Sequence, residues 1–410
     1  MGTEFLNLKE PEEVKNILNS LVIDNAAEKV ELTKSFGRIL AENIYSTMDL
    51  PPFDRVAMDG YAVRAENIFG ASEDEPKALE MIDVVRAGDN PLKSVENDTC
   101  IEVGTGAPAP PLADAVVMVE FTERSGNEIL IYQGVAPGEN IVKKGSDLKK
   151  DILILKKATI LTPDKIGVLS AMGIKEVLVY FKPKVGIIST GNEIVAPGRE
   201  INPGEIYDVN SQTVAATILA CGCLPTGVLI VKDDFQSLKN AINSLMDSDI
   251  IITSGGTSAG AGDVLRAVVE DMGEILVHGI AIKPGKPTLI GRIDNKTIIG
   301  LPGYPVAALL ILETFVVPFL RRNLGLAFEE DGYDTIQIEI SRRFHTSRGR
   351  THNLLVKVKN GFAIPILKDS GAITALAEAD GYIEIPKNTE IIEKGTLVDV
   401  KLFRQRFTLF

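Results

Sequence analysis

The segment 175–326 alternates between apolar strand patterns and amphipathic helix patterns, and this alternation restricts the fold more than any other feature of the chain. The strand patterns are "KVGIIST", "TGVLIV", "DIIITS" and "KTIIGL". The helix patterns that follow them are "SQTVAATILACG", "DFQSLKNAINSLM", "DVLRAVVEDMG" and "VAALLILETFVVPFLRRN". Strands separated by helices pair in parallel, because each helix returns the chain to the same end of the sheet. The sequence therefore predicts a three-layer α/β domain over residues 175–328.

The rest of the 410-residue chain predicts further, β-rich domains. Residues 47–140 contain short apolar runs broken by Gly, Pro, Asp and Asn, which is typical of a β-rich insert domain. Residues 329–410 show short strands with turn signals and predict a small C-terminal β-barrel domain. Segments 1–46 and 141–174 flank the insert, so we expect them to form one discontinuous, elongated linker domain. Helix patterns lie at 10–22, 31–43 and 162–173, and the N-terminal helix can pack on another domain.

Composition excludes several classes of protein. The net charge of −13 argues against a general nucleic-acid binder, whose surface is basic. Three cysteines (Cys100, Cys221 and Cys223) are too few for a disulfide framework, so we expect reduced core residues in a cytoplasmic protein. The N-terminus lacks the pattern of a signal peptide, and the longest apolar run, 306–320, is too short to span a membrane.

Candidate binding residues lie in the loops that follow the predicted α/β strands. In open α/β sheets, ligands bind beyond the carboxyl ends of the strands. The loop Ser254-Gly255-Gly256 runs on to Asp263 at a helix start, where backbone N–H groups suit an anion. Carboxylates that face a phosphate suit Mg²⁺. The predicted metal ligands are Glu193, Asp233 and Asp263, and the predicted anion-binding cations are Lys283 and Lys286.

Each of these features also has a structural explanation. The glycine-rich loop matches neither G-x-x-x-x-G-K-[ST] nor G-x-G-x-x-G, and it can be a tight connection. Asp233 and Asp234 can cap the next helix, and the two lysines, which flank prolines, can form an exposed turn. We favour binding, because loops that carry glycine with a charged residue follow strand after strand and meet at one edge of the sheet.

Side chains for nucleophilic catalysis are scarce. The chain has three histidines, His278, His345 and His352, and none accompanies a G-x-S-x-G or a Cys–His arrangement. We expect His278, in the α/β domain, to be structural. Metal-assisted chemistry on a phosphate-bearing substrate fits better than acyl transfer, because it needs positioning and charge neutralisation.

Seven motifs, spread from the β-rich insert to the α/β domain, together resemble one known family. They are "PPFDRVAMDGYAV", "GTGAPAP", "STGNEI", "GEIYDVN", "SGGTSAGAGD", "IKPGKP" and "LPGYPVA". Their order and approximate spacing resemble those of molybdopterin molybdenumtransferase, the MoeA or gephyrin E-domain family. The resemblance extends over residues 1 to about 405.

The resemblance implies an activity, ligands and further site residues. Such proteins bind adenylylated molybdopterin and molybdate (or tungstate), release AMP with a divalent cation such as Mg²⁺, and form an elongated homodimer. The molybdopterin adenylyltransferase is an implied partner. The sulfur ligands of the metal would come from the substrate. The family's functional positions match Asp59, Thr105, Glu193, Asp233, Asp263, Lys283, Lys286, Pro302 and Pro305. Asp59 of one subunit would face Glu193 of the other, with Asp59, Glu193 and Asp233 as the catalytic group.

Two departures from the family pattern leave the substrate detail and the choice of oxyanion open. Many relatives have Ser where this chain has Val56, and Asn where it has Tyr304. Two other functions also stay open: an adenylyltransferase that makes the adenylylated pterin, and a non-enzymatic scaffold. The "MDGYA" loop argues against the first, and the four carboxylates at 59, 193, 233 and 263 argue against the second.

Overall fold

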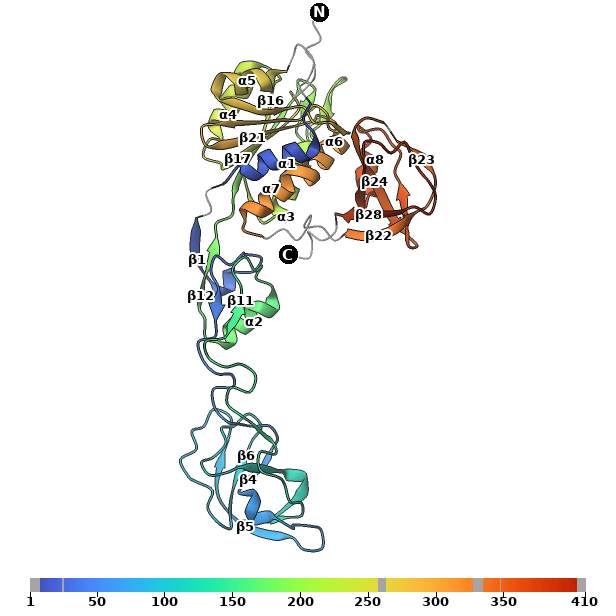
Figure 1. Ribbon diagram of the computed structural model, residues 1–410. Coiled ribbons are helices and arrows are strands. Elements are labelled where there is room, and N and C mark those ends of the chain that lie inside the picture. The colour runs from blue at the N-terminus through green and yellow to red at the C-terminus, as the bar shows by residue number, and fades with distance from the viewer. Residues whose placement is uncertain (1–7, 24–25, 257–262, 327–334, 347, 404–410) are drawn as a thin grey trace, which may run out of the picture. The chain divides into compact units, whose positions relative to one another are not determined.

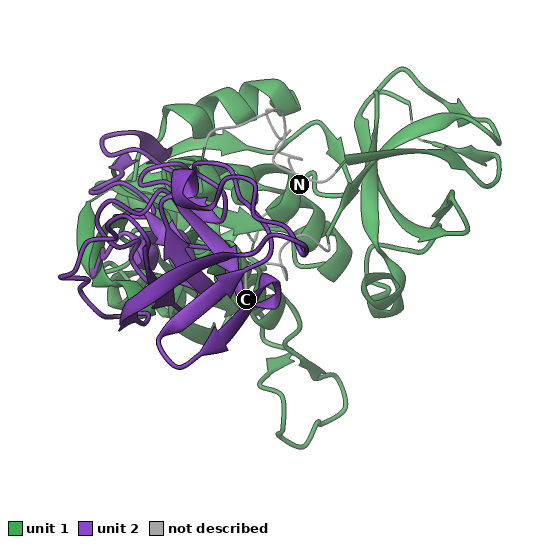
Figure 2. Cartoon of the chain, turned by 90° about the horizontal axis from the view of Figure 1, so that it is seen from below, with its two compact units in different colours: residues 1–42, 158–166, 176–410 green, residues 43–157, 167–175 purple. Residues whose placement is uncertain are grey.

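The computed structural model describes residues 8–23, 26–256, 263–326, 335–346 and 348–403. The chain divides into two compact units (Figure 2). The first comprises residues 1–42, 158–166 and 176–410, and the second comprises residues 43–157 and 167–175. This division is coarser than the four predicted domains, whose boundaries stay a prediction.

A six-stranded sheet lies at the centre of the α/β part of the first unit, in the order β16-β13-β17-β21-β20-β18 (Figure 1). Its strands are β13 (Lys184–Thr190), β16 (Leu224–Val231), β17 (Ile250–Ser254), β18 (Glu274–His278), β20 (Leu289–Ile293) and β21 (Lys296–Leu301). The first four strands in this order pair in parallel, as predicted. β20 and β18 pair antiparallel, so the prediction of a wholly parallel sheet was wrong at this edge. The reason is local, because the short turn at 294–295 joins β20 to β21 without a helix.

Helices cover both faces of this sheet, as predicted. They are α3 (Asn210–Ala220), α4 (Phe235–Ser244), α5 (Val264–Met272), α6 (Pro305–Ile311) and α7 (Val317–Asn323), with a π-helical segment, Leu312–Val316, between the last two. Neighbouring strand residues belong to different cores. Ile187 and Ile252 pack with α3, α6 and α7, whereas Ile188 and Ile251 pack with α4 and α5. This alternation follows from the two-residue period of a strand, and it explains why the strands are apolar throughout.

The N-terminal helix α1 (Pro11–Ser20) joins the first of these two cores. Val14 and Leu18 are buried there together with residues of α7. The backbone N–H of Ile23 donates to Asn323 Oδ1 at 2.9 Å, which fixes the end of the helical segment. The helix thus packs on the α/β domain, as the sequence allowed.

The helix predicted over 31–43 was wrong. The strand β1 (Ala27–Glu31) pairs antiparallel with β12 (Glu176–Tyr180), and only a 3₁₀ turn, Leu32–Lys34, follows. Gly37 then adopts a φ of 70°, which ends any helix. Backbone hydrogen bonds to a strand far along the chain replaced the local helical bonds.

The second unit is β-rich, as predicted for the insert. Its six-stranded sheet has the order β7-β4-β6-β5-β9-β8. The strands are β4 (Gly60–Val63), β5 (Lys77–Val85), β6 (Thr99–Val103), β7 (Ala115–Met118), β8 (Thr122–Ser125) and β9 (Glu128–Ile131). Short paired strands flank it, β3 (Arg55–Val56) with β10 (Ile141–Val142) and β2 (Ile44–Tyr45) with β11 (Leu153–Leu155). The helix α2 (Pro163–Ala171) is divided between the two units, with residues up to 166 in the first and residues from 167 in the second.

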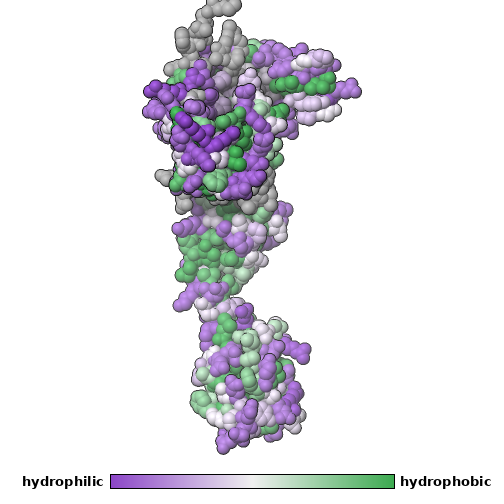
Figure 3. Space-filling view, turned by 90° about the vertical axis from the view of Figure 1, so that its right-hand side faces the viewer, coloured by the Kyte–Doolittle hydropathy of each residue, from purple (hydrophilic) through white to green (hydrophobic). Residues whose placement is uncertain are grey.

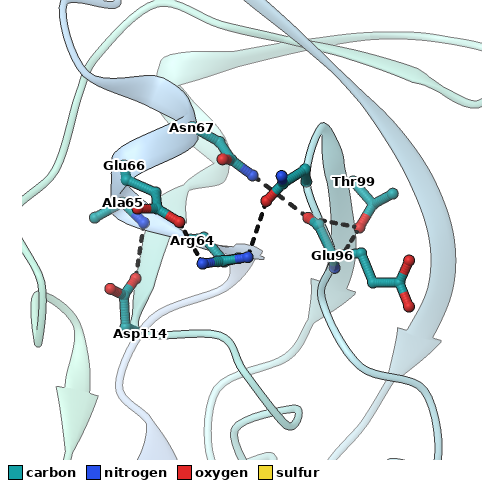
Figure 4. A network of polar contacts seen from close by, with 8 residues as sticks. Arg64, Ala65, Glu66, Asn67, Glu96, Thr99 and Asp114 are labelled. Atoms are coloured by element: carbon teal, nitrogen blue, oxygen red, sulfur yellow. Dashed lines mark hydrogen bonds and ion pairs between the residues drawn. The ribbon is translucent and has the colours of Figure 1, made fainter.

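Polar contacts hold the loops around this sheet (Figure 4). The Asp114 carboxylate accepts a hydrogen bond of 2.7 Å from the backbone N–H of Ala65, at the start of a 3₁₀ turn. Asn67 donates to the Glu96 carbonyl at 3.4 Å, and the Thr99 hydroxyl donates to that carbonyl at 3.1 Å. The turn that follows β4 is therefore tied to the loops before β6 and β7.

The C-terminal domain is a small β-barrel, as predicted. Its strands pair in the order β24-β25-β22-β28-β26, and β26 pairs again with β24, which closes the sheet. They are β22 (Thr335–Ile340), β24 (Thr351–Lys359), β25 (Phe362–Pro365), β26 (Gly381–Ile385) and β28 (Leu397–Leu402). β19 (Ile282–Lys283) of the α/β part pairs in parallel with β24. The first unit also contains four short strands and one helix. They are β14 (Ile194–Val195) and β15 (Ile206–Tyr207) in the α/β part, and β23 (Phe344–His345), β27 (Ile391–Ile392) and α8 (Ile373–Glu378) in the C-terminal domain.

Candidate active site

A cavity of about 950 Å³ lies at the carboxyl ends of β13, β17 and β21. The register brings these ends into line, because Ser189 pairs with Ser254 and Ser254 pairs with Leu301. The residues predicted from sequence that line the cavity are Glu193, Asp233, Ser254, Gly255, Gly256, Pro302 and Pro305. The sequence therefore predicted the location of the cavity from the order of the strands.

A glycine turn forms one wall of this cavity. Gly255 and Gly256 have φ angles of 93° and 67°, in the left-handed region that favours glycine. A Cβ atom on Gly255 would lie 2.2 Å from the carbonyl oxygen of Thr190. A Cβ atom on Gly256 would lie 3.2 Å from Asp233 Oδ1. The carbonyl of Thr190 leaves no space for a side chain at Gly255, and the positive φ favours glycine at both positions, so the turn brings bare backbone next to a carboxylate. The rest of the predicted loop, 257–262, lies outside the described residues.

The carboxylates of Asp233 and Glu193 face the same cavity. Burial raises the pKa of Asp233, and a hydrogen bond of 3.3 Å from the Thr190 hydroxyl opposes this effect. The negative charges of Glu193, Asp263 and Asp234 raise the pKa of Asp233 further. Several carboxylates thus repel one another across a small space, which is a field that attracts a cation.

The two neighbouring aspartates Asp233 and Asp234 have different roles. Asp234 caps α4, since its side chain accepts hydrogen bonds from the backbone N–H (2.9 Å) and the hydroxyl (2.7 Å) of Ser237. These bonds lower the pKa of Asp234. Asp233 lines the cavity instead. The capping explanation therefore applies to the second aspartate, and the first is left for a ligand.

Asp263 stabilises the start of the helix α5. Its side chain caps α5 by accepting a hydrogen bond of 3.0 Å from the backbone N–H of Arg266. Its other oxygen lies 2.9 Å from His278 Nε2. His278 thus has a carboxylate partner within the fold. The predicted role of Asp263 as a metal ligand stays a prediction.

The loop that carries Lys283 and Lys286 lines the cavity through Pro284, Gly285 and Pro287. The Lys283 side chain is exposed, and its positive charge contributes to the lowered pKa of His352 on β24. The backbone carbonyl of Lys286 accepts hydrogen bonds from the N–H groups of Ile280 and Thr288. Both cations therefore lie beside the cavity wall and not among the described residues that line it.

Residues of the C-terminal domain complete the cavity, and the sequence did not predict them. Ser370, Gly371 and Ile373 line it. The carbonyl of Ser370 accepts a hydrogen bond of 3.0 Å from the backbone N–H of Val306, at the start of α6. This long-range backbone bond, which leaves no pattern in the sequence, attaches the segment to the cavity.

Asp208 and Asn210 also line the cavity and were not singled out, although both lie in the quoted "GEIYDVN" motif. Asp208 Oδ1 accepts hydrogen bonds of 3.1 Å from the Ser189 hydroxyl and from the backbone N–H of Ser211. Asn210 donates to Ser254 Oγ at 2.8 Å and to the Gly303 carbonyl at 2.7 Å. They join the carboxyl ends of β13, β17 and β21 into one polar floor.

In the second unit, the structure brings Asp59 and Thr105 together. Asp59 Oδ1 accepts hydrogen bonds from the backbone N–H of Thr105 at 2.6 Å and from its hydroxyl at 2.8 Å. These bonds lower the pKa of Asp59, so the exposed carboxylate is charged at neutral pH. Gly60 is required next to it, because a Cβ atom there would lie 1.9 Å from the carbonyl oxygen of Val117. The "MDGYA" loop thus displays a fixed carboxylate.

The chemistry of the cavity fits a divalent cation held partly by the substrate. Across the described ranges, no three His, Cys, Asp or Glu side chains gather as a complete metal site. Mg²⁺ is usually bound through one or two carboxylates together with substrate phosphates. Glu193 and Asp233 line one cavity, and their mutual repulsion with neighbouring carboxylates would be relieved by such an ion.

The cysteines are core residues, as predicted. Cys100, Cys221 and Cys223 are free and buried. Burial raises the pKa of Cys100 to about 12, so this thiol stays protonated. Among the helices in the described part of the chain, none has the length and apolar character needed to cross a membrane.

Family models match three successive parts of the chain. Residues 9–173 match the MoeA N-terminal region (domain I and II), residues 186–322 match a probable molybdopterin binding domain, and residues 337–403 match the MoeA C-terminal region (domain IV). The cavity therefore lies mainly in the part of the chain that matches the molybdopterin binding model.

Whole-chain relatives point the same way. The chain is 32% identical to molybdopterin molybdenumtransferase 2 of Mycobacterium tuberculosis, over 90% of this chain and 94% of the relative. It is 33% identical to the molybdopterin molybdenumtransferase of Bacillus subtilis, over 92% of this chain and 90% of the relative. Its fold matches the crystal structure of a molybdopterin biosynthesis MoeA protein from Pyrococcus horikosii with a TM-score of 0.87 and 41% identity, covering 97% of this chain and 100% of that one.

Proposed function

Because this chain belongs to the MoeA family, we propose that it is a molybdopterin molybdenumtransferase, which inserts molybdenum into molybdopterin during molybdenum cofactor biosynthesis. The observation that carries this proposal is the cavity at the strand ends, where a glycine turn and two carboxylates meet. A substrate with a phosphate group and a large organic part suits a cavity of about 950 Å³.

We further propose that the substrate is adenylylated molybdopterin, that a divalent cation such as Mg²⁺ is needed, and that AMP leaves. Molybdate or tungstate supplies the metal atom as the second substrate. The support is electrostatic. A pyrophosphate carries several negative charges and cannot approach Glu193 and Asp233 unless a cation lies between them. When bound, the cation would neutralise charge on the phosphate oxygens.

The residues of the chain would then position the substrate. Glu193 and Asp233 would hold the cation, and the backbone at Gly255 would lie against the phosphate without a side chain in the way. Lys283 and Lys286, beside the cavity wall, would attract the oxyanion by charge. Pro302 and Pro305 would keep the loop before α6 in one conformation.

The experiment that tests this proposal is an assay of AMP release. Purified protein is incubated with adenylylated molybdopterin, Mg²⁺ and molybdate, and AMP is measured together with metal bound to the pterin. Release of AMP that depends on both ions supports the proposal. Formation of adenylylated pterin from ATP would instead identify an adenylyltransferase. If the protein reacts with neither substrate, a non-enzymatic scaffold is the remaining function.

We also propose a cytoplasmic homodimer. The support for the dimer comes from the second unit, where exposed apolar side chains gather around β2 and β11 (Figure 3). Tyr45 is 50% exposed, Ile152 51% and Leu153 40%, and an apolar surface of this kind is typical of a protein interface. The support for the cytoplasm is that the cysteines of the chain are free, which suits a reducing compartment. The molybdopterin adenylyltransferase, which would supply the substrate, is the proposed second partner.

The dimer would build a composite active site, with Asp59 and Thr105 of one subunit facing Glu193 of the other. The support is that Asp59 is a fixed, exposed carboxylate in a unit that lacks the cavity. Mixing the inactive variants Asp59→Ala and Glu193→Ala under subunit exchange should restore about a quarter of wild-type activity, because half of the dimers are mixed and each has one intact site. If heterodimers form and no activity returns, each site lies within one chain.

A further inference from the structure

Tyr304 presents an aromatic ring to the cavity at a fixed place. It lines the cavity and is 66% exposed, which is high for a large aromatic side chain. Its backbone is held at the start of α6, where its carbonyl accepts a hydrogen bond of 2.9 Å from the N–H of Ala308. Gly371 packs against one side of the ring, since a Cβ atom on Gly371 would lie 3.4 Å from Tyr304 Cδ1 and 3.6 Å from Cε1. The ring is therefore supported from one side and open on another.

Further apolar side chains line the same cavity and are also exposed. Ile206 is 54% exposed, Tyr207 41% and Ile373 56%. Exposed apolar side chains that gather around one cavity are typical of a binding site for a ligand with apolar faces. A phosphate or a metal oxyanion has no such face, so this part of the cavity suits the organic part of the substrate.

Hydrogen-bond acceptors without partners belong to the lining of the same cavity. Asn210 donates to the carbonyl of Gly303, the residue before Tyr304, and its own Oδ1 has no partner among the described residues. Asp208 Oδ2 likewise has no partner in the described part of the chain. These side chains are only 7% and 4% exposed and both line the cavity. A buried acceptor without a partner is unfavourable, and an N–H group of a ligand would satisfy it.

From these observations we propose that Tyr304 is a stacking residue for a flat heterocycle of the substrate, with Asn210 and Asp208 accepting hydrogen bonds from its N–H groups. This inference rests on the proposed function and names the substrate contact. The pterin and the adenine of adenylylated molybdopterin share the required chemistry, a flat ring system with N–H donors at its edge. An oxyanion without a bridging cation is disfavoured here, because the Asp208 carboxylate would repel it.

The absence of tryptophan from the sequence allows a direct binding test. In the variant Tyr304→Trp, the single indole replaces the ring, and its fluorescence is quenched when a heterocycle stacks on it. AMP and 6-hydroxymethylpterin are titrated separately to distinguish the two ends of the substrate. The matched control is Phe69→Trp, because Phe69 is 61% exposed in the other unit and is not among the residues that line the cavity. The proposal is supported if either ligand quenches the fluorescence of Tyr304→Trp saturably and leaves that of the control variant unchanged. It is overturned if neither ligand quenches the fluorescence of Tyr304→Trp.

Steady-state kinetics with adenylylated molybdopterin give a second, independent readout. Tyr304→Ala should raise KM by roughly tenfold or more, with little change in kcat, because base–aromatic stacking contributes at this level. Tyr304→Phe keeps the ring and should keep the KM of the wild type. An unchanged KM in Tyr304→Ala, with AMP still released, refutes the stacking role and leaves the proposed function intact. If the fluorescence of Tyr304→Trp is quenched but the wild-type protein releases no AMP, the proposed function is refuted and the heterocycle-binding site is retained.

Discussion

Gly255 gives the sharpest test of how the active-site turn is built. The substitution Gly255→Ala places a Cβ atom 2.2 Å from the carbonyl oxygen of Thr190, which is backbone and cannot rotate away. The φ of 93° at this position adds roughly 1–2 kcal/mol for any residue other than glycine. Shifting packed backbone to relieve the contact costs about 1–3 kcal/mol more. We therefore expect a loss of about 3 kcal/mol in the stability of the α/β part.

Thiol labelling measures this loss without interference from the other unit. Cys223 is buried in the α/β core at 2% exposure, whereas Cys100 is buried in the core of the second unit. Labelling under native conditions, read by mass spectrometry of each cysteine peptide, reports the opening of each unit separately. A loss of about 3 kcal/mol raises the labelling rate of Cys223 by roughly a hundredfold. The labelling rate of Cys100 should stay unchanged.

Two further glycine variants separate the contact from the backbone strain. Gly198→Ala has a φ of 90° with no heavy atom within 4 Å, so it tests the strain alone. Gly303→Ala has no positive φ, and its new Cβ would lie 4.0 Å from the nearest atom, the Gly255 Cα, so it should change little. If Gly255→Ala labels at the wild-type rate, or if Gly198→Ala has the same effect, the close approach to Thr190 is not what requires glycine.

Three other predictions concern charge. Glu193→Gln and Asp233→Asn should each lower the rate of AMP release by roughly a hundredfold or more, while the labelling rates of Cys223 and Cys100 stay at the wild-type level. Near-normal turnover would show that these carboxylates have no role in the reaction. Lys286→Ala should raise the concentration of molybdate or substrate needed for half-maximal rate, and the difference from wild type should narrow with added salt; an unchanged requirement for both would contradict the anion-binding role. Burial, aided by Lys283, lowers the pKa of His352 from 6.5 to about 4. Between pH 6.5 and pH 4, the histidine is protonated in the unfolded chain but not in the folded chain. The free energy of unfolding therefore falls as the pH drops through this range. The loss is roughly 3 kcal/mol at most, and solvent screening makes it smaller. His352→Phe should flatten this part of the curve of denaturation midpoint against pH, and a parallel curve would show that another group causes the loss.

The sequence by itself determined the α/β layers and the position of the cavity. The strands β13, β16, β17 and β21 and the helices between them follow from a local period of apolar residues, which reports burial directly. Chain order then fixes a parallel arrangement, and a parallel arrangement fixes which loops meet. For this reason Glu193, Asp233 and the glycine turn were predicted at one edge, and they do line one cavity.

Only the tertiary structure decided how these residues are used. Asp233 and Asp234 are alike in sequence, and the cap formed with Ser237 is what leaves the first aspartate for a ligand. Asp59 and Thr105 are held together by hydrogen bonds between loops that lie far apart in the chain. The segment around Gly371 reaches the cavity through a backbone bond to Val306. Periodicity reports only whether a residue is buried, whereas hydrogen-bond partners and close contacts depend on residues distant in the sequence, so the roles of these side chains become visible only once the chain is folded.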